Sequence, residues 1–209
     1  MFKIPLNLDI NETPVCAVSR NSEKAKILAE CSLIVWDECT MAHKKAVEAV
    51  NRTLQDIRRN DHIMGRITVL FCGDFRQTLP VITRGTRADE VNACLKCSVL
   101  WPRVQKLSLT RNMRAHLGGN PRAQEFSDAL LKIGEGSFPE SNGLVTLPEN
   151  LCKIVPSVEK LIYSVYGDVS QITHKDNNSW LCERAILTPK NDQAAAINHS
   201  ILEKVEGDE

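Results

Sequence analysis

The chain has 209 residues, of which 43% are hydrophobic and 25% are charged, as in an ordinary soluble globular protein. Its 26 Lys and Arg residues balance 26 Asp and Glu residues, so there is no bulk basicity pointing to nucleic acid. A local basic groove is still compatible with that balance. No stretch reaches the roughly 18 apolar residues of a membrane span, and no membrane partner is expected.

Eight cysteines are present, and four of them lie in apolar runs, where a free cysteine behaves as a small hydrophobe. These are Cys31, Cys72, Cys152 and Cys182. No secretory signal is evident, so a reducing intracellular compartment is expected. Cys94 and Cys97 have the spacing of zinc ligands, but zinc needs about four ligands and no second pair occurs. A zinc-binding domain would have to recruit His116 or Cys152, and it is kept as an alternative.

The first hundred residues alternate between predicted strands and helices. In chain order these are a strand at Val15–Ser19, a helix capped by Asn21 or Ser22 and running to about Cys31, a strand ending at Asp37, a helix at Ala42–Arg59 and a strand at Arg66–Cys72. The second helix places its apolar residues on one face: Ala46, Val50, Leu54 and Ile57. This alternation predicts an α/β fold with a parallel sheet covered by helices.

Beyond the second strand the pattern is less regular. An irregular loop is predicted over Leu79–Thr86, and Trp101-Pro102 marks a boundary because a residue before proline disfavours helix. Further predicted elements are a strand at Val104–Leu109, a helix at Pro121–Ile133, an exposed connection at Gly134–Pro156 around a short strand at Leu144–Leu147, a helix at Ser157–Tyr166, a strand at Arg184–Leu187 and a helix from Asn191 to about Val205.

Acidic residues follow two of the predicted strands. One apolar run ends in Asp37 and Glu38, and the other is followed by Asp74 and Gln77. Ligands gather at the carboxyl ends of parallel strands, so we expect these side chains at one edge. Asp37 would lie near a nucleotide-bound magnesium ion and Glu38 would orient a water, as on the Walker B strand of P-loop NTPases. The alternative is a pair of solvated acids in a loop, since such runs are common by chance.

Three segments carry a family resemblance. They are Trp36-Asp37-Glu38-Cys39-Thr40-Met41-Ala42, Gly73-Asp74-Phe75-Arg76-Gln77-Thr78-Leu79-Pro80-Val81 and Leu109-Thr110-Arg111-Asn112-Met113-Arg114. In this order they resemble motifs II, III and IV of the Pif (petite integration frequency) family of ATP-dependent DNA helicases in superfamily one, nearest its eukaryotic branch with the Helitron transposon helicases. The resemblance runs from Phe2 to Asp192. It implies RecA-like parallel sheets flanked by helices, with residues 1–103 in the first lobe and 104–209 in the second.

The phosphate-binding loop of such enzymes is absent from the sequence. No glycine opens a Gly-Lys-Ser or Gly-Lys-Thr segment, which would cradle the phosphates. By resemblance, the chain is expected to start after that loop and to stop before motifs V and VI. It is therefore expected to be a partial P-loop NTPase helicase core. One departure from the family pattern is Gly65-Arg66, where the family tends to have two glycines.

The resemblance also implies residue roles. Asp37 would coordinate magnesium through ATP, Glu38 would polarise the attacking water, and Asp74 and Gln77 would face the nucleotide. Gln77 would contact the γ-phosphate, or else only satisfy the backbone of its turn. Arg114 would reach the γ-phosphate from the second lobe as an arginine finger does.

Other candidates have open alternatives. Arg111 competes with Arg114, although the motif aligns Arg114, and a surface salt bridge is the alternative for either. Arg76 and Arg84 flank a loop that faces DNA, nucleotide or solvent. Phe75, Trp36 and Trp101 are expected to pack in the protein interior rather than to stack on a base.

The expected function is part of an ATP-dependent 5′-to-3′ DNA helicase that couples hydrolysis to unwinding in DNA repair, recombination and telomere maintenance. Its cofactors would be ATP and Mg²⁺, and its partners single-stranded and duplex DNA, with a monomeric core in the nucleus or, alternatively, the mitochondrion. The 209 residues alone are expected to be inactive. The alternative is a catalytically inactive, helicase-derived DNA-binding or interaction module.

Overall fold

The computed structural model describes residues 2–8, 11–117, 122–148, 151–169 and 178–205. The chain divides into two compact units, Met1–Phe138 and Pro139–Glu209. Within the first unit, Arg76 Nε lies 3.9 Å from Glu135 Oε1, and this contact joins the segment after the second strand to the end of a later helix. The predicted boundary between two RecA-like lobes, near Pro102, is not tested by this division into compact units, and it stays a prediction.

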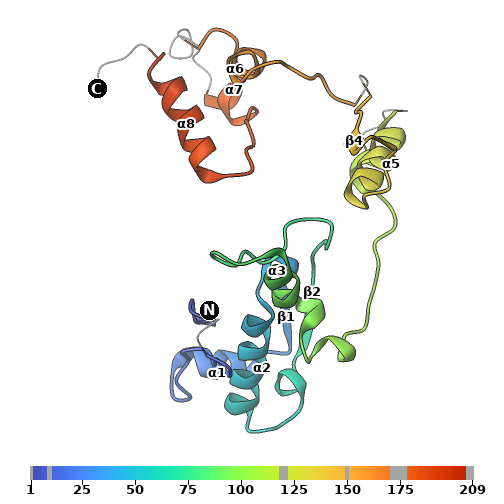
Figure 1. The fold of residues 1–209 in the computed structure, drawn as a ribbon. Helices are drawn as coiled ribbons and strands as arrows, with labels where there is room; N and C mark the ends of the chain where they lie inside the picture. Colours follow the sequence, from blue (N-terminus) through green and yellow to red (C-terminus); the bar gives the residue numbers. More distant parts are fainter. Residues whose placement is uncertain (1, 9–10, 118–121, 149–150, 170–177, 206–209) are drawn as a thin grey trace. The chain divides into compact units, whose positions relative to one another are not determined.

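The first unit is built around two short parallel strands (Figure 1). Its helices and strands are α1 (Glu23–Glu30), β1 (Leu33–Trp36), α2 (Lys44–Arg58), β2 (Thr68–Phe71), α3 (Arg87–Ala93), α4 (Met113–Leu117) and α5 (Ala123–Gly134). Single 3₁₀ turns lie between them: η1 (Cys39–Met41), η2 (Ile63–Arg66), η3 (Leu95–Cys97) and η4 (Trp101–Arg103). The predicted order of strands and helices up to Cys72 is confirmed, except at residues 15–19.

Polar caps fix where the two main helices begin. The Ser22 hydroxyl accepts a hydrogen bond of 3.3 Å from Ala25 N, which satisfies one of the free N–H groups of the first turn of α1. At α2 the cap is His43, whose Nδ1 accepts from Lys45 N at 3.0 Å. Each helix therefore begins within two residues of its predicted start.

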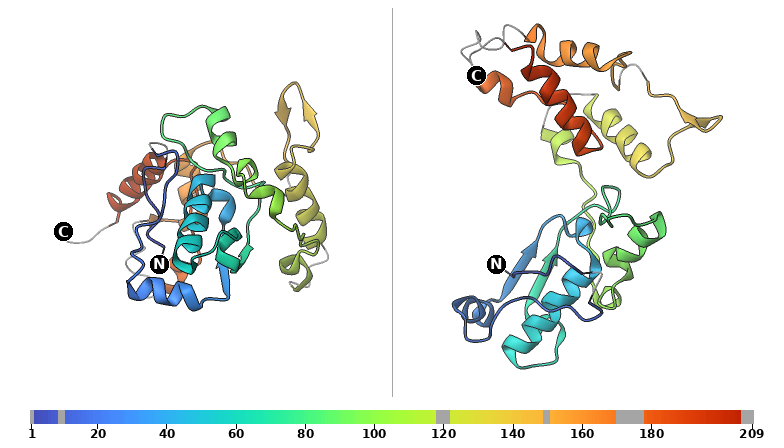
Figure 2. Two further views of the ribbon diagram at one scale, coloured as in Figure 1. Left: turned by 90° about the horizontal axis from the view of Figure 1, so that it is seen from below. Right: turned by 60° about the vertical axis from the view of Figure 1, so that its left-hand side comes forward.

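The sheet is parallel, as predicted, with Leu33 paired to Thr68 and Trp36 to Phe71. One strand leads through α2 into the next, as expected of two parallel neighbours. Figure 2 shows the two strands side by side with α2 beside them. Both strands run in the same direction, so Trp36 and Phe71 mark a common edge where the following residues emerge.

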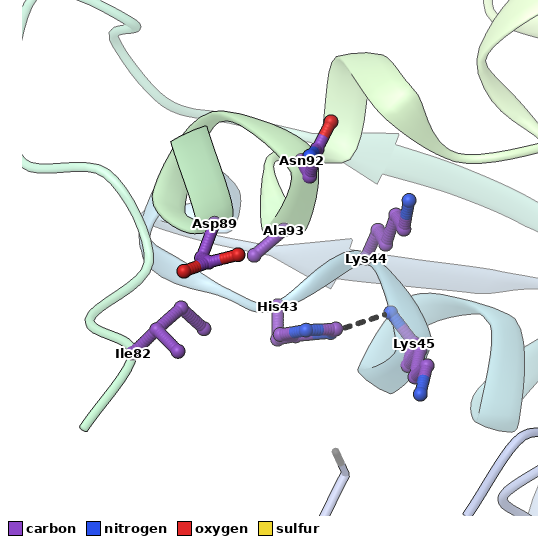
Figure 3. A pocket seen from close by; sticks show the side chains of 7 residues that line it. All are labelled: His43, Lys44, Lys45, Ile82, Asp89, Asn92 and Ala93. Carbon is purple, nitrogen blue, oxygen red and sulfur yellow. Dashed lines mark hydrogen bonds between the residues drawn. The ribbon is translucent and has the colours of Figure 1, made fainter. Parts of the chain in front are cut away.

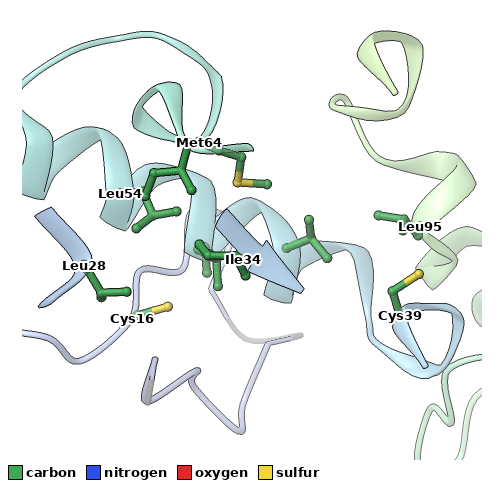
Figure 4. Close-up of a cluster of buried hydrophobic side chains, with 11 residues drawn as sticks. Cys16, Leu28, Ile34, Cys39, Leu54, Met64 and Leu95 are labelled. Atoms are coloured by element: carbon green, nitrogen blue, oxygen red, sulfur yellow. The ribbon is translucent and has the colours of Figure 1, made fainter. Parts of the chain in front are cut away.

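The core lies between α2 and the sheet. Four residues of α2 are at most 1% exposed: Val47, Ala49, Val50 and Leu54. Figure 4 shows Leu54 with Ile34 of β1 and Met64 of the turn before β2. The predicted apolar face of α2 is confirmed at Ala46, Val50 and Leu54, while Ile57 is partly buried against the same cluster.

The opposite face of the two strands is open. Leu33 and Val35 of β1 are 53% and 58% exposed, and Leu70 of β2 is 46% exposed. Because the two apolar runs are continuous, both faces of each strand were expected to be buried. Among the described residues only the α2 face is covered, so burial alternates along each strand as the period-two geometry requires.

Three predicted strands do not form. Residues 15–19, 104–109 and 184–187 have no ladder partner among the described residues. Apolar composition alone does not make a strand, because the backbone groups need a neighbouring strand to pair with. At Cys16 the N–H instead donates to Thr53 Oγ1 at 2.9 Å. Leu109 and Leu187 are almost fully exposed.

The described residues of the second unit form a hairpin and three helices. These are β3 (Glu140–Ser141), β4 (Leu144–Val145), α6 (Val158–Tyr166), α7 (Asn178–Cys182) and α8 (Asn191–Leu202). The hairpin turns at Asn142 and Gly143, both with positive φ, as a two-residue Asn-Gly loop favours. The predicted helices at 157–166 and from 191 are confirmed, with Ser157 as the cap of α6. Within the described ranges, no helix is long and apolar enough to cross a membrane.

Candidate functional site

The carboxyl ends of β1 and β2 are joined beyond the ladder itself. Cys72 N donates to Trp36 O at 2.9 Å, and Cys39 N donates to Cys72 O at 2.9 Å. The segment after β1 thus stays paired with the segment after β2 for several residues. Asp37 and Glu38 on one segment and Asp74 on the other consequently emerge at one edge, as the sequence predicts.

A left-handed residue turns the chain at the end of β1. Glu38 has φ 50° and ψ 38° and is the residue before the η1 turn, and its N–H donates to Asp37 Oδ1 at 2.9 Å. A non-glycine residue in this region is uncommon and marks a tight local constraint. Both acidic side chains are exposed, whereas Cys39 and Thr40 directly after them are buried. The carboxylates of Asp37 and Glu38 therefore face solvent, while the buried residues Cys39 and Thr40 fix the turn that carries them.

Thr40 and Gly73 lock the two segments together. The Thr40 hydroxyl, on a fully buried side chain, donates to Asp74 O at 3.4 Å. A Cβ on Gly73 would lie 2.9 Å from Thr40 Cγ2 and 3.3 Å from Cys39 Sγ, closer than side chains normally pack. The close approach of the η1 turn thus requires glycine at position 73, and no role was predicted for Gly73 or Thr40. A glycine directly after a strand is the signal that could have indicated this approach.

The segment after β2 forms a tight turn. The Asp74 carboxylate accepts from Arg76 N at 3.0 Å, and Asp74 O accepts from Gln77 N at 3.0 Å. Arg76 Nε also lies 3.8 Å from Asp74 Oδ1. The Gln77 side chain is exposed. The Gln77 N–H closes the turn while its side chain is exposed, and the predicted contact of that side chain with a γ-phosphate stays a prediction.

Aromatic side chains pack around the ends of the two strands and the turn at Asp74. The rings of Phe75 and Trp101 meet edge to face with centroids 5.6 Å apart, and Lys96 Nζ lies 4.2 Å from the Phe75 centroid. Trp36 similarly contacts Phe71 with centroids 6.2 Å apart. These side chains pack against one another, as expected from the sequence.

The arginines of the third motif lie in a separate segment. Arg114 belongs to α4, and its side chain lies outside the described residues, so its predicted role is not tested. The Arg111 guanidinium is exposed and bonds Nε2 of His116. Asn112 between them donates from Nδ2 to Ser127 Oγ at 2.8 Å and attaches the motif to α5. Arg84, in the irregular loop, is exposed with φ 60°.

The oxygen donors at the strand edge suit magnesium. Asp37 and Asp74 offer carboxylates, the hard ligands that Mg²⁺ takes from proteins alongside waters and phosphates. One or two protein carboxylates are enough for a nucleotide-bound ion. Over the described ranges, no group of three or more His, Cys, Asp or Glu side chains could hold a metal alone. Cys97 of the zinc-like pair instead donates from Sγ to Val91 O at 3.3 Å.

The first unit also has a hollow of about 300 Å³ (Figure 3). Its lining residues come from the start of α2, the irregular loop and α3: His43, Lys44, Lys45, Ile82, Asp89, Asn92 and Ala93. Asp89 faces it while accepting hydrogen bonds from Thr86, chiefly from the backbone N–H, which lowers the pKa of Asp89. None of the candidate site residues lines this hollow.

Parallel strands covered by a helix, with polar side chains at their carboxyl ends, are typical of α/β proteins that bind ligands at that edge of the sheet. The family model described as PIF1-like helicase matches residues 1–143. The chain therefore belongs to the PIF1-like helicase family, and the match includes every candidate site residue.

Two curated relatives agree. The ATP-dependent DNA helicase Pif1 of Psychrobacter sp. (strain PRwf-1) is 35% identical over 142 residues, which cover 68% of this chain and 22% of that protein. The ATP-dependent DNA helicase PIF1 of Candida albicans is 25% identical over 134 residues, covering 62% of this chain and 14% of that protein. The chain spans less than a quarter of the length of either relative.

The fold is also that of solved Pif1 helicases. The crystal structure of Pif1 helicase from Bacteroides in complex with ADP-AlF3 and ssDNA matches with a TM-score of 0.58 at 18% identity, over 96% of this chain and 43% of that chain. A double mutant of the Bacteroides protein matches with a TM-score of 0.51, over 90% of this chain. At these identities the likeness shows the fold alone, and it confirms the RecA-like α/β class predicted from the sequence.

Proposed function

We propose that this chain is part of an ATP-dependent DNA helicase, in which it supplies the magnesium- and water-facing half of the ATP site. The observation that carries the proposal is the joined strand edge. Asp37 and Glu38 emerge beside Asp74 because Cys39 N and Cys72 O are held at 2.9 Å. Membership of the PIF1-like helicase family supports the same assignment.

In this proposal each residue has a separate task. Asp37 would hold the magnesium ion that accompanies ATP, and the bound ion would supply positive charge to the phosphates, which Asp74 would face. Glu38 accepts a hydrogen bond from the attacking water and orients it. Gln77 faces the terminal phosphate, and Arg114 supplies positive charge to the transferred group. The tight turn at Asp74 keeps Gln77 in a fixed relation to the Asp37–Glu38 pair.

The first test uses the 209 residues alone. They contain no Gly-Lys-Ser or Gly-Lys-Thr segment, so the phosphate-cradling N–H groups and lysine are missing. We expect no DNA-stimulated release of phosphate from ATP. Robust turnover that disappears in Glu38→Gln would show that this chain needs no such loop. Nucleotide-independent binding of single-stranded DNA, without turnover in any longer form, would favour the interaction-module alternative.

The second test uses a longer chain in which a phosphate-binding loop precedes residue 1. Glu38→Gln should lower the hydrolysis rate by at least about 100-fold and leave ATP affinity nearly unchanged, because it removes the water-orienting carboxylate only. Asp37→Asn should instead weaken magnesium-dependent nucleotide binding. Steady-state ATPase assays and nucleotide titrations separate the two effects. Equal loss of affinity in both variants would contradict the assignment.

The third test concerns the arginines. In the same longer chain, Arg114→Ala should lower the hydrolysis rate by on the order of 10³-fold with little change in ATP affinity, as for other arginine fingers. Arg111→Ala is the matched control and should be near neutral, because Arg111 is exposed and bonds His116. The reverse pattern would show that the motif is misaligned.

We also propose 5′-to-3′ polarity, use of single-stranded and duplex DNA, and action in repair, recombination and telomere maintenance, all by family resemblance. Strand-displacement assays on substrates with opposite tails test the polarity directly. A nuclear location, with the mitochondrion as the alternative, stays a prediction that imaging of the tagged protein would check.

A further inference from the structure

One exposed turn in the second unit joins an asparagine to a glycine. Asn142 and Gly143 form the two-residue loop between β3 and β4, and the sequence contains no other Asn-Gly pair. Both residues are exposed, and both have positive φ, 52° and 76°. Within the described ranges, neither the Asn142 side chain nor Gly143 N has a hydrogen-bond partner. Water therefore reaches both the side-chain amide and the peptide group that follows it.

Gly143 leaves its peptide nitrogen open to the side chain of Asn142. A Cβ built on Gly143 would have no heavy atom within 4 Å, so nothing outside the turn crowds this position. Glycine also has no side chain of its own to shield the nitrogen. Gly143 N and Asn142 Cγ are joined through the C, Cα and Cβ atoms of Asn142, so a bond between them closes a five-membered ring.

The hairpin that holds this turn is weakly fixed. Its strands have two residues each, Glu140–Ser141 and Leu144–Val145, and all four residues are exposed. An isolated two-stranded hairpin is at best marginally stable in water, and this one buries no side chain of its strands. Local opening of the turn therefore costs little free energy, and it lets Asn142 take the backbone angles that ring closure needs.

We propose that Asn142 is a site of spontaneous modification, where the chain converts this asparagine into aspartate and isoaspartate. Gly143 N loses its proton and attacks Asn142 Cγ, and the side-chain nitrogen leaves with that proton as ammonia. One water then opens the cyclic imide. Breaking the new bond between Gly143 N and Cγ gives aspartate, and breaking the original peptide bond gives isoaspartate. No group is oxidised or reduced, and water is the only co-reactant.

Both products change the turn. Each carries a carboxylate close to Glu140 in the sequence, where asparagine is neutral. Isoaspartate also adds one carbon to the main chain, and a two-residue turn with defined φ and ψ does not accommodate it. The reaction needs only this chain and water, so it does not depend on the proposed function.

Peptide mapping of the purified 209 residues tests the proposal, after incubation for weeks at neutral pH and with an unincubated sample as the reference. Trypsin cleavage after Lys132 and Lys153 gives peptide 133–153, whose mass should rise by the exchange of one NH for one O. Fragment ions should place the change at Asn142 and not at Asn150. The modified peptide should separate into two products of equal mass. The rate should rise about tenfold per pH unit above neutral, because the attacking nitrogen must be deprotonated.

Two controls complete the test. Asn60 is the internal control and should stay unmodified, because its side chain donates to Arg58 O and accepts from His62 N. Gly143→Ala should slow the change at Asn142 by at least about tenfold, because a side chain then crowds the attacking nitrogen. An unchanged peptide 133–153, modification of Asn60 as fast as that of Asn142, or equal rates with and without Gly143→Ala would each overturn the proposal.

Discussion

Replacing Gly73 by alanine should destabilise the joint between the strand ends. The new Cβ would meet Thr40 Cγ2 at 2.9 Å, Thr40 Oγ1 at 3.2 Å and Cys39 Sγ at 3.3 Å. Thr40 is fully buried, and turning its side chain away would break its hydrogen bond to Asp74 O. Overpacking of this kind costs about 1–3 kcal/mol of unfolding free energy.

The magnitude can be assigned to one contact by a double-mutant cycle. Thr40→Ser removes Cγ2, the nearest atom, and keeps the hydroxyl; losing this buried methyl should cost about 1 kcal/mol. In Gly73→Ala/Thr40→Ser the closest clash is gone but the contacts at 3.2 and 3.3 Å remain. We therefore expect the double variant to be about 1 kcal/mol more stable than the sum of the single changes predicts.

Urea unfolding followed by tryptophan fluorescence measures this coupling. The chain has three tryptophans, and Trp180→Phe in all variants restricts the signal to Trp36 and Trp101 of the first unit. Gly134→Ala is the matched control, because its nearest contact is an ordinary 3.5 Å to the Arg76 side chain. It should be neutral or stabilising and uncoupled to Thr40→Ser. Strict additivity of Gly73→Ala and Thr40→Ser would refute the contact as the cause.

Two further predictions concern stability. Gly65→Ala should cost about 1–2 kcal/mol more than Gly136→Ala, because both glycines have positive φ but only a Cβ on Gly65 would meet Leu54 O, at 2.8 Å; equal losses in urea unfolding would contradict this. Hydrogen bonds from Thr86 hold the pKa of Asp89 below its unfolded value of about 3.9. At pH values between the folded and the unfolded pKa, the unfolded state therefore binds more protons. The stabilisation from Asp89 is present above about pH 4 and is lost as the pH falls through the folded pKa. Between about pH 5 and pH 2, unfolding free energy should fall less steeply in Asp89→Asn than in the unsubstituted chain, and identical slopes would rule out a contribution from Asp89.

Local signals in the sequence were sufficient for the helices and the strand edge. Ser22 caps α1 because its hydroxyl can accept a backbone N–H, and α2 shows its buried face through the spacing of Ala46, Val50 and Leu54. The acids after two apolar runs predicted a shared edge, because parallel strands end together. The hairpin at Asn142-Gly143 was not predicted, although Asn-Gly favours such a turn, and only its second strand was expected.

Tertiary structure alone decided which apolar runs became strands and which residues hold together the two segments that carry the acidic residues. Residues 104–109 have the composition of a strand, but a strand forms only where another backbone accepts its hydrogen bonds. In the same way, the contact of Gly73 with Thr40 and the joining of Cys39 to Cys72 bring together residues more than thirty positions apart. No local pattern encodes such a contact, because it depends on how α2 returns the chain beside β1.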